Sequence, residues 1–221
     1  VFPPDSGRVL LDGKPLDTGK VRIGYLPEER GLYPKKPIMD QLVYIGALHG
    51  MRAGEAKKSA MALLERLEMA EYANKKLDTL SKGNQQKIQL VATLISDPQI
   101  VILDEPFSGL DPVNAMLLKD IVREQIAAGK IVLFSSHQMN YIEEFCDDIV
   151  ILNRGRIVLS GNIREIKHSY DRSRMLVYGP NLQAILDFSR NLSGELVASS
   201  EISGDHVGIR LRNPGLKERF G

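Results

Sequence analysis

The sequence has little of what would mark a secreted, membrane-spanning or nucleic-acid-binding protein. Its one cysteine, Cys146, excludes an internal disulfide and fits a reducing compartment. Lys and Arg together number 29 and Asp and Glu 28, so no excess of positive charge favours nucleic acid, and we expect no nucleic-acid partner. The longest apolar runs, such as residues 131–134, are too short to span a bilayer. Work at a membrane would therefore need a partner that crosses it.

The pattern of apolar residues predicts an α/β protein. Residues 8–16 read as a hairpin around Asp12-Gly13, a pair that suits a type I′ turn. A strand over 21–26 is followed by a helical stretch over 37–95. The fully apolar segments 100–103 and 131–134 are typical of buried parallel strands. Later segments predict helices over 113–127 and 139–145, a hairpin over 149–159, and a small β-α-β-β unit after residue 173.

These elements predict four parts. Residues 1–36 form the remainder of an N-terminal β part, and 37–97 a helical subdomain with no parallel strand beside it in the sequence. Residues 98–170 form an α/β core, and 171–221 an accessory α+β unit. The boundary before the last part lies near residues 168–173.

Two acids follow the apolar strand 100–103. A buried parallel strand would deliver Asp104 and Glu105 to the carboxyl edge of the sheet, where open α/β folds bind ligands. The alternative to a ligand site is that both acids are simply solvated at the end of a strand. Pro106 to Asp111 directly follows them, in the order Pro-Phe-Ser-Gly-Leu-Asp.

A Ser-capped helix start is predicted at Leu80-Ser81-Lys82-Gly83-Asn84-Gln85-Gln86. A Ser hydroxyl and the exposed N–H groups at a helix start can bind a phosphate, and Gly83 lets the backbone come close. An ordinary capped helix without a ligand is the alternative, and the direction of Lys82, toward a ligand or into water, stays open. His137 follows another buried strand in Ser135-Ser136-His137, where it is either a ligand-sensing or a structural histidine.

In their order and spacing these segments resemble the motifs of the ATP-binding subunit of an ATP-binding-cassette (ABC) transporter. The resemblance covers about residues 1–167, and the stretch 27–34 with the short C-terminal unit is similar to ATPases of bacterial sodium or drug exporters. It implies a P-loop NTPase core of the ABC type with a helical signature subdomain. It also implies ATP and Mg²⁺ as cofactors, a membrane-spanning permease and a second ATP-binding subunit as partners, and a peripheral position on the cytoplasmic side of the membrane.

The resemblance also implies roles for single residues. Asp104 would support Mg²⁺, Glu105 would polarise the attacking water, and His137 would contact the γ-phosphate. Glu28 stands where the family usually has Gln and would lie on the metal side, or be a solvated acid near a hinge. The segment 80–86 resembles the signature motif of the family and is called the signature segment below. The remaining candidates would contact nucleotide from this segment and from the loop after the two acids: Ser81, Lys82, Gly83, Asn84, Gln85 and Asp111.

One motif that the family needs does not occur in these residues. No GxxxxGK[ST] phosphate loop is found, and the nearest approaches, Gly7 to Lys14 and Gly13 to Lys20, fail on spacing and on the final residue. We therefore expect an N-terminally incomplete ATPase subunit, inactive by itself, with exposed sheet edges and apolar surface. Two alternatives stay open: a soluble ABC-type ATPase acting on DNA or ribosomes, and a non-catalytic interaction subunit.

Overall fold

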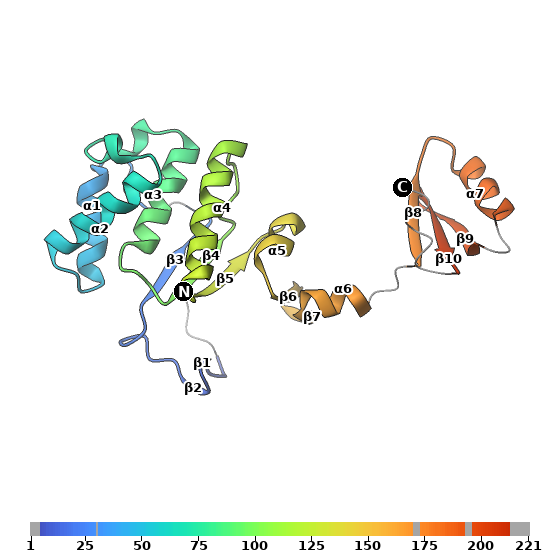
Figure 1. Cartoon of the computed structure of the whole chain (residues 1–221), viewed down its shortest axis with the longest axis horizontal. Helices are drawn as coiled ribbons and strands as arrows, with labels where there is room; N and C mark the ends of the chain where they lie inside the picture. Colours follow the sequence, from blue (N-terminus) through green and yellow to red (C-terminus); the bar gives the residue numbers. More distant parts are fainter. Residues whose placement is uncertain (1–4, 30, 170–172, 193–195, 213–221) are drawn as a thin grey trace. The chain divides into compact units, whose positions relative to one another are not determined.

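A computed structural model describes residues 5–29, 31–169, 173–192 and 196–212. The chain divides into two compact units, Val1–Cys146 and Asp147–Gly221 (Figure 1). The four-part division expected from the sequence stays a prediction, and part of the expected boundary near 168–173 lies outside the described residues. No helix in the described ranges is long and apolar enough to cross a membrane.

The first unit is built on a small parallel sheet. Its strands are β3 (Ile23–Leu26), β4 (Ile100–Asp104) and β5 (Ile131–Ser135), in the order β3-β4-β5. The register pairs Tyr25 with Ile102 and Ile102 with Leu133. A separate hairpin of β1 (Leu10–Leu11) and β2 (Lys14–Pro15) has Asp12 and Gly13 at positive φ, which confirms the turn that the Asp-Gly pair predicts.

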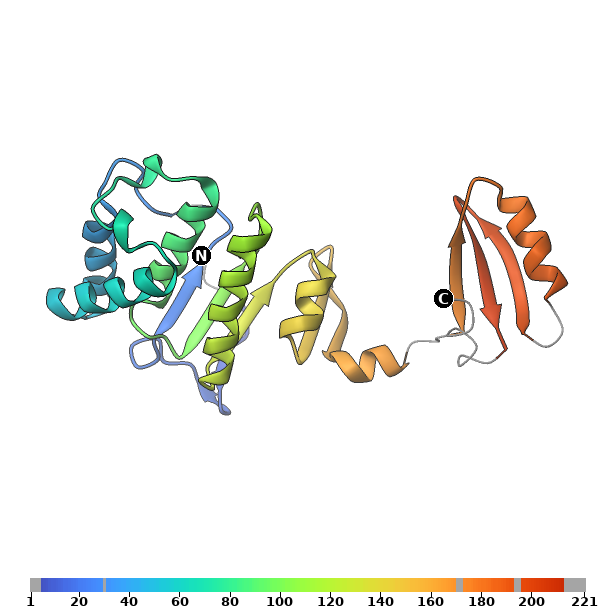
Figure 2. The same ribbon diagram turned by 45° about the horizontal axis from the view of Figure 1, so that its top comes forward.

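The predicted helical stretch is confirmed. It contains α1 (Ile38–Leu48), α2 (Ala53–Arg66), two short 3₁₀ turns at Ala70–Tyr72 and Leu77–Thr79, and α3 (Lys82–Leu94). In the α/β part, α4 (Pro112–Ala127) lies between β4 and β5 in the sequence, and α5 (Met139–Phe145) follows β5. Figure 2 shows α4 lying across the sheet.

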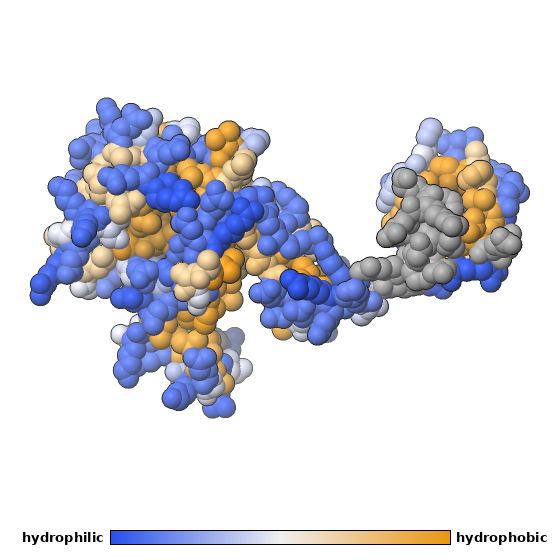
Figure 3. All heavy atoms as spheres, viewed as in Figure 1, coloured by the Kyte–Doolittle hydropathy of each residue, from blue (hydrophilic) through white to orange (hydrophobic). Residues whose placement is uncertain are grey.

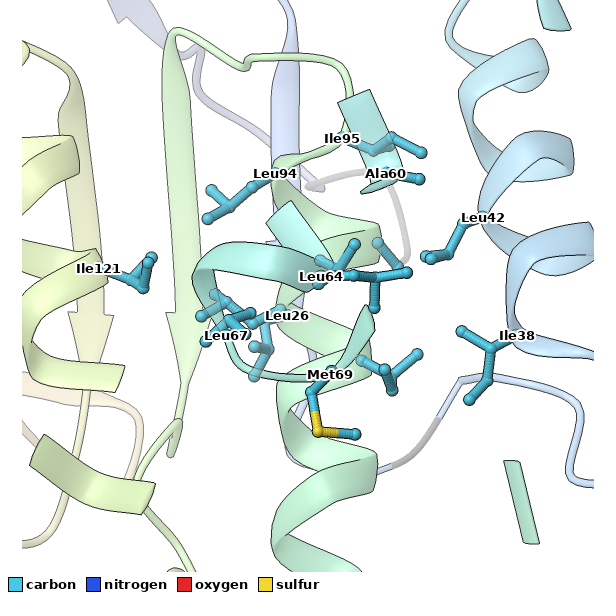
Figure 4. Close-up of a cluster of buried hydrophobic side chains, with 14 of the residues drawn as sticks. Leu26, Ile38, Leu42, Ala60, Leu64, Leu67, Met69, Leu94, Ile95 and Ile121 are labelled. Carbon is cyan, nitrogen blue, oxygen red and sulfur yellow. The ribbon is translucent and has the colours of Figure 1, made fainter. Parts of the chain in front are cut away.

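One hydrophobic core joins the helices to one face of this sheet. Side chains of α1, α2 and α3 meet those of β3, β4 and α4, among them Leu26, Leu42, Leu64 and Ile121 (Figure 4). Gly24 is required at the contact of β3 with α3, because an added Cβ would lie 2.4 Å from the Thr93 carbonyl oxygen. This packing fixes the start of α3 relative to the end of β4.

The other face of the sheet is open. By the alternation of the strands it carries Tyr25, Ile131 and Leu133, and these side chains are 48%, 44% and 53% exposed. Among the described strands β5 pairs only with β4, so its second edge carries no partner strand. Both features agree with the expected exposed edge and apolar surface, and Figure 3 shows apolar surface reaching solvent on this unit.

The second unit contains a hairpin, a short helix and a small antiparallel sheet with one further helix. The hairpin consists of β6 (Asp148–Asn153) and β7 (Arg156–Asn162), and α6 (Ile163–Ser169) follows it. The sheet contains β8 (Arg174–Tyr178), β10 (His206–Leu211) and β9 (Val197–Ser203) in the antiparallel order β8-β10-β9, with α7 (Leu182–Asn191) after β8. This sheet is the β-α-β-β unit that the sequence predicts.

Candidate active site

The carboxyl edge of the parallel sheet holds the two acids and the histidine together. Asp104 ends β4, and its Oδ1 accepts a hydrogen bond from the Ser135 hydroxyl at 2.5 Å. Glu105 lies one residue further, and its backbone N–H donates to the Ser135 carbonyl at 3.1 Å. Because β4 and β5 are parallel neighbours, the segment 135–137 reaches the same edge as the acids. The pairing of two strands thus builds the cluster.

Glu105 is held by several contacts. One carboxylate oxygen, Oε1, lies 2.7 Å from both the His137 backbone nitrogen and the His137 Nδ1. The other, Oε2, accepts from the Ser136 hydroxyl at 3.3 Å. The side chain of Glu105 is 15% exposed, whereas that of His137 is 73% exposed. With Nδ1 on the carboxylate, Nε2 is the imidazole nitrogen that can meet a ligand from solvent.

The backbone of Glu105 is strained. Its φ is +45°, which an L residue with a bulky side chain rarely adopts. Such conformations cost about 1–3 kcal/mol and persist where surrounding contacts over-determine them. The contacts to residues 135–137 serve that purpose, and they aim the carboxylate across the sheet edge rather than along β4.

A buried aromatic cluster fixes the loop after Glu105. Phe107 is 4% exposed, and its ring lies 4.3 Å from that of Tyr141 and 5.7 Å from that of Phe134, measured between centroids. The Phe145 ring stacks on it at 5.8 Å. The loop that begins at Glu105 is therefore anchored to β5 and α5.

The signature segment starts α3 as a capped helix. The Ser81 hydroxyl accepts a hydrogen bond from the Asn84 N–H at 3.3 Å, and the Gln85 side chain donates to the Leu80 carbonyl at 2.9 Å. Gly83 is buried and Lys82 is exposed. The positive end of the helix dipole lies at this helix start, where exposed Ser81 and Lys82 reach solvent.

The signature helix is joined to the loop after Glu105. The Gln86 side chain is 7% exposed, and its Nε2 donates to the Pro106 carbonyl at 3.3 Å. A Cβ added at Gly83 would lie 3.1 Å from the Asn114 Nδ2, so the start of α3 touches the start of α4. These contacts link the start of α3 to the loop after Glu105 and to the start of α4.

Asp111 caps α4 instead of pointing away from the chain. Its Oδ1 accepts from the N–H groups of Val113 and Asn114 at 3.1 and 3.0 Å, and its Oδ2 lies 2.5 Å from the Asn114 Nδ2. These hydrogen bonds, above all those from Asn114, hold the pKa of Asp111 below its ordinary value. The carboxylate is thus anionic and engaged within its own chain, and its nucleotide contact stays a prediction.

Glu28 follows β3 at the same edge of the sheet, exposed to solvent. Its loop is held by Gln89, whose Nε2 donates to the carbonyls of Pro27 and Glu29 at 3.2 Å each. No group of three or more His, Cys, Asp or Glu able to hold a metal occurs among the described residues. Asp104 and Glu28 nevertheless suit Mg²⁺, because this ion uses one or two carboxylates together with water and phosphate oxygens.

Four residues that the structure places in or beside the site were given no role from the sequence, although three of them lie within the quoted motif segments. Ser135 and Ser136 contact the two acids, while Gln86 and Gln89 fix the loops after β4 and β3. The available signal for the last two was a pair of amides at spacing i, i+3 in a helix segment otherwise rich in apolar residues.

Comparison with known proteins identifies the family of the chain. The family described as ABC transporter matches residues 1–108. The chain is 47% identical to the uncharacterized ABC transporter ATP-binding protein YhaQ of Bacillus subtilis, over 97% of this chain and 71% of that protein. It is 43% identical to an uncharacterized ABC transporter ATP-binding protein of Alkalihalophilus pseudofirmus, over the whole chain and 86% of that protein.

A solved structure shares the fold. It is described as the structure of an ATP-binding subunit of an ABC transporter, with a TM-score of 0.66 and 29% identity, over 75% of this chain and 70% of that one. Sequence relatives and fold both indicate the same family. The chain belongs to the ATP-binding subunits of ABC transporters.

Proposed function

We propose that this chain serves in an ATP-binding subunit which, when a phosphate loop completes it, hydrolyses ATP to power export through a membrane-spanning permease, in a pair with a second ATP-binding subunit. The observation that carries the proposal is the cluster of Glu105, Ser136 and His137 at the sheet edge. Export is favoured by relatives named for linearmycin resistance in Bacillus subtilis (34% identical) and for Nod factor export in Ralstonia nicotianae (29%).

Within the site, each group has a distinct task. Glu105 orients the water that attacks the γ-phosphate, and its carboxylate is aimed by Ser136 and the His137 N–H. The His137 Nε2 contacts the γ-phosphate, while its Nδ1 stays on Glu105. Because phosphoryl transfer depends on positioning and charge neutralisation, a preset carboxylate and imidazole are what the chain has to contribute.

Mg²⁺ would be held by Asp104, with Glu28 on the same side of the site, and would neutralise charge on the phosphates when bound. Asp104 is oriented for this task by the Ser135 hydroxyl. Glu28 adds a negative charge where an amide would add none, so it strengthens the hold on the metal and repels the triphosphate.

The start of α3 serves the other subunit of the pair. Ser81, Gly83, Asn84 and Gln85 close over the ATP bound by the partner, with Lys82 adding positive charge there. Asp111 sets the start of α4 beside this segment. Each ATP then lies between the sheet edge of one subunit and the signature of the other.

The membrane side of the function rests on the permease. A loop with exposed Tyr33, next to Leu32 and Pro34, offers apolar surface for a permease segment. The chain then works as a peripheral protein at the cytoplasmic face of the membrane, and the permease selects the cargo.

Residues 1–221 contain no lysine-bearing phosphate loop, so we propose that they hydrolyse ATP negligibly by themselves. The test is a chain extended at its N-terminus by a strand, a GxxxxGK[ST] loop and a helix. The extended chain should release phosphate from Mg·ATP, and Glu105→Gln should abolish release. The control Glu71→Gln changes an exposed acid on a 3₁₀ turn and should leave the rate unchanged. Equal rates for the two variants, or hydrolysis by residues 1–221 alone, would contradict the proposal.

A further inference from the structure

Two neighbouring segments of the first unit bring four lysines together on an exposed surface. An antiparallel bridge pairs Pro37 with Lys76, and the Ile38 N–H donates to the Lys75 carbonyl at 3.0 Å. The segment before α1 therefore runs beside the segment before the second 3₁₀ turn. The exposed lysines of the two segments are called the lysine patch: Lys35, Lys36, Lys75 and Lys76.

The backbone under the patch is held in place. The Gln41 side chain is buried; its Oε1 accepts from the Tyr33 N–H at 2.7 Å, and its Nε2 donates to the carbonyls of Tyr33 and Lys36 at 3.0 Å each. The Asp78 N–H donates to the Pro34 carbonyl at 2.9 Å and so joins the two segments a second time. The fold thus fixes where the lysines start, and only their side chains have to reorient to meet a charged surface.

The patch keeps its positive charge. Among the residues that the structure describes, none of its ammonium groups lies in an ion pair, whereas Lys20, Lys119 and Lys130 each have a carboxylate partner. The acids within four residues of the patch in the sequence are exposed, and no ion pair joins them to it in the described ranges: Asp40, Glu71 and Asp78. Since the chain has 29 Lys and Arg against 28 Asp and Glu, the patch is a local concentration of charge that attracts an anionic partner.

We propose that the lysine patch binds the anionic phospholipid headgroups of the membrane beside the permease. The inference deepens the proposed function and rests on it for the position of the chain at the membrane. Tyr33, offered there to the permease, is 66% exposed and lies in the same Gln41-held loop, so the patch continues that surface. Clusters of about four to eight basic residues bind anionic lipid at membranes, with about fivefold in affinity for each lysine near the surface.

The residue type favours a lipid surface over a single anionic group. Arginine presents a planar fork that binds one carboxylate or phosphate by two hydrogen bonds, whereas the lysine ammonium is a point charge on a flexible stem. The patch has lysine at all four positions, so it suits many exchanging headgroups better than one carboxylate of a permease loop. An acidic protein segment is therefore the weaker occupant, and the test includes it.

Vesicle flotation tests the proposal on residues 1–221, without permease or nucleotide. Vesicles of equal parts phosphatidylglycerol and phosphatidylcholine should carry the chain to the top of the gradient, while aggregated protein stays at the bottom. Vesicles of phosphatidylcholine alone should not carry it. The Debye length falls from about 10 Å at 0.1 M salt to about 3 Å at 1 M, so binding should be lost at 1 M. Equal binding to both kinds of vesicle, or binding that persists at 1 M salt, would assign the attraction to apolar surface and overturn the proposal.

Two matched pairs of lysines locate the contact. Lys75→Gln with Lys76→Gln removes half of the patch, and about fivefold for each lysine predicts about thirtyfold weaker partitioning onto the anionic vesicles. Lys57→Gln with Lys58→Gln removes the same charge from exposed positions of α2 and should change partitioning little. Equal weakening by the two pairs would overturn the proposal. Lys75→Arg with Lys76→Arg preserves the charge and should bind as the parent chain does; loss of binding there would show that charge does not carry the contact.

Competition separates headgroups from other anions. At constant ionic strength neither polyglutamate nor inorganic phosphate should displace the chain from the vesicles. Displacement by phosphate would identify a site for one discrete anion, and binding of polyglutamate without binding of anionic vesicles would assign the patch to an acidic protein segment; either result overturns the proposal. Flotation uses neither ATP nor Glu105, so its failure would leave the hydrolysis proposal standing, and failure of hydrolysis would leave flotation unchanged.

Discussion

The buried amide of Gln86 gives the sharpest test of how the signature helix is held to the loop after Glu105. Its Nε2 is a donor to the Pro106 carbonyl, and both residues are buried. Gln86→Met keeps the length of the side chain and removes the donor, leaving a buried carbonyl without this partner. An unsatisfied buried group costs about 1–3 kcal/mol, so we expect unfolding free energy to fall by about that amount.

Gln86→Glu makes the test directional. At neutral pH a carboxylate would face the Pro106 carbonyl, so acceptor would meet acceptor and the loss should exceed that in the Met variant. In acid the protonated carboxyl can donate, and the Glu variant should then regain stability relative to Met.

Urea unfolding measures both variants, and amide exchange at Ser108 and Leu110 reports on the loop itself. Those two N–H groups close turns onto the carbonyls of Glu105 and Phe107. Their exchange should speed up in both variants at neutral pH. Stabilities equal to the parent protein, or a Glu variant no worse than Met at neutral pH, would refute the reasoning.

Three further predictions concern the first unit. Asp97→Asn removes the ion pair with Lys130 (2.5 Å) at a residue with φ of +49°, which Asn tolerates; the hydrogen bond from Lys130 lowers the pKa of Asp97. This surface pair should therefore contribute up to about 1 kcal/mol above the ordinary pKa of Asp, and the difference in urea unfolding between variant and parent should vanish as pH falls through the lowered, folded-state pKa. Gly24→Ala drives a Cβ toward the Thr93 carbonyl and should cost about 1–3 kcal/mol in thermal unfolding, and an unchanged transition would exclude the close contact of β3 with α3. The open face of the parallel sheet should promote self-association through its apolar side chains, and Leu133→Lys, which puts charge there, should reduce it in sedimentation. The control Leu48→Lys, on the exposed side of α1, should leave self-association unchanged.

Local patterns in the sequence predicted most of the elements. The Asp-Gly turn, the apolar strands ending at Asp104 and Ser135, and the β-α-β-β order after residue 173 each follow from neighbours in the chain. The Asp111-Pro112 pair also carried a signal for a helix start, since Asp is a preferred N-cap and Pro a preferred first residue. The motif led us to expect Asp111 as a nucleotide contact, and its role as the cap of α4 emerges only from the structure.

Contacts between distant residues could not be predicted from the residues alone. The Glu105 carboxylate meets His137 because β4 and β5 are neighbours in register, and Gln86 reaches Pro106 because the core places α3 beside the end of β4. The positive φ of Glu105 likewise depends on contacts from another strand. The order β8-β10-β9 is also a matter of tertiary pairing.

The central claim is that Glu105 and Ser81 act on ATP from opposite subunits of a pair. The most direct measurement mixes two inactive extended chains, one with Glu105→Gln and the other with Ser81→Arg, and records phosphate release. A mixed pair then contains one site with an intact Glu105 from one chain and an intact Ser81 from the other, so activity should appear on mixing. A chain carrying both changes, mixed with the parent chain, offers no such site within the mixed pair. Release from the mixture no greater than from either variant alone would contradict the account.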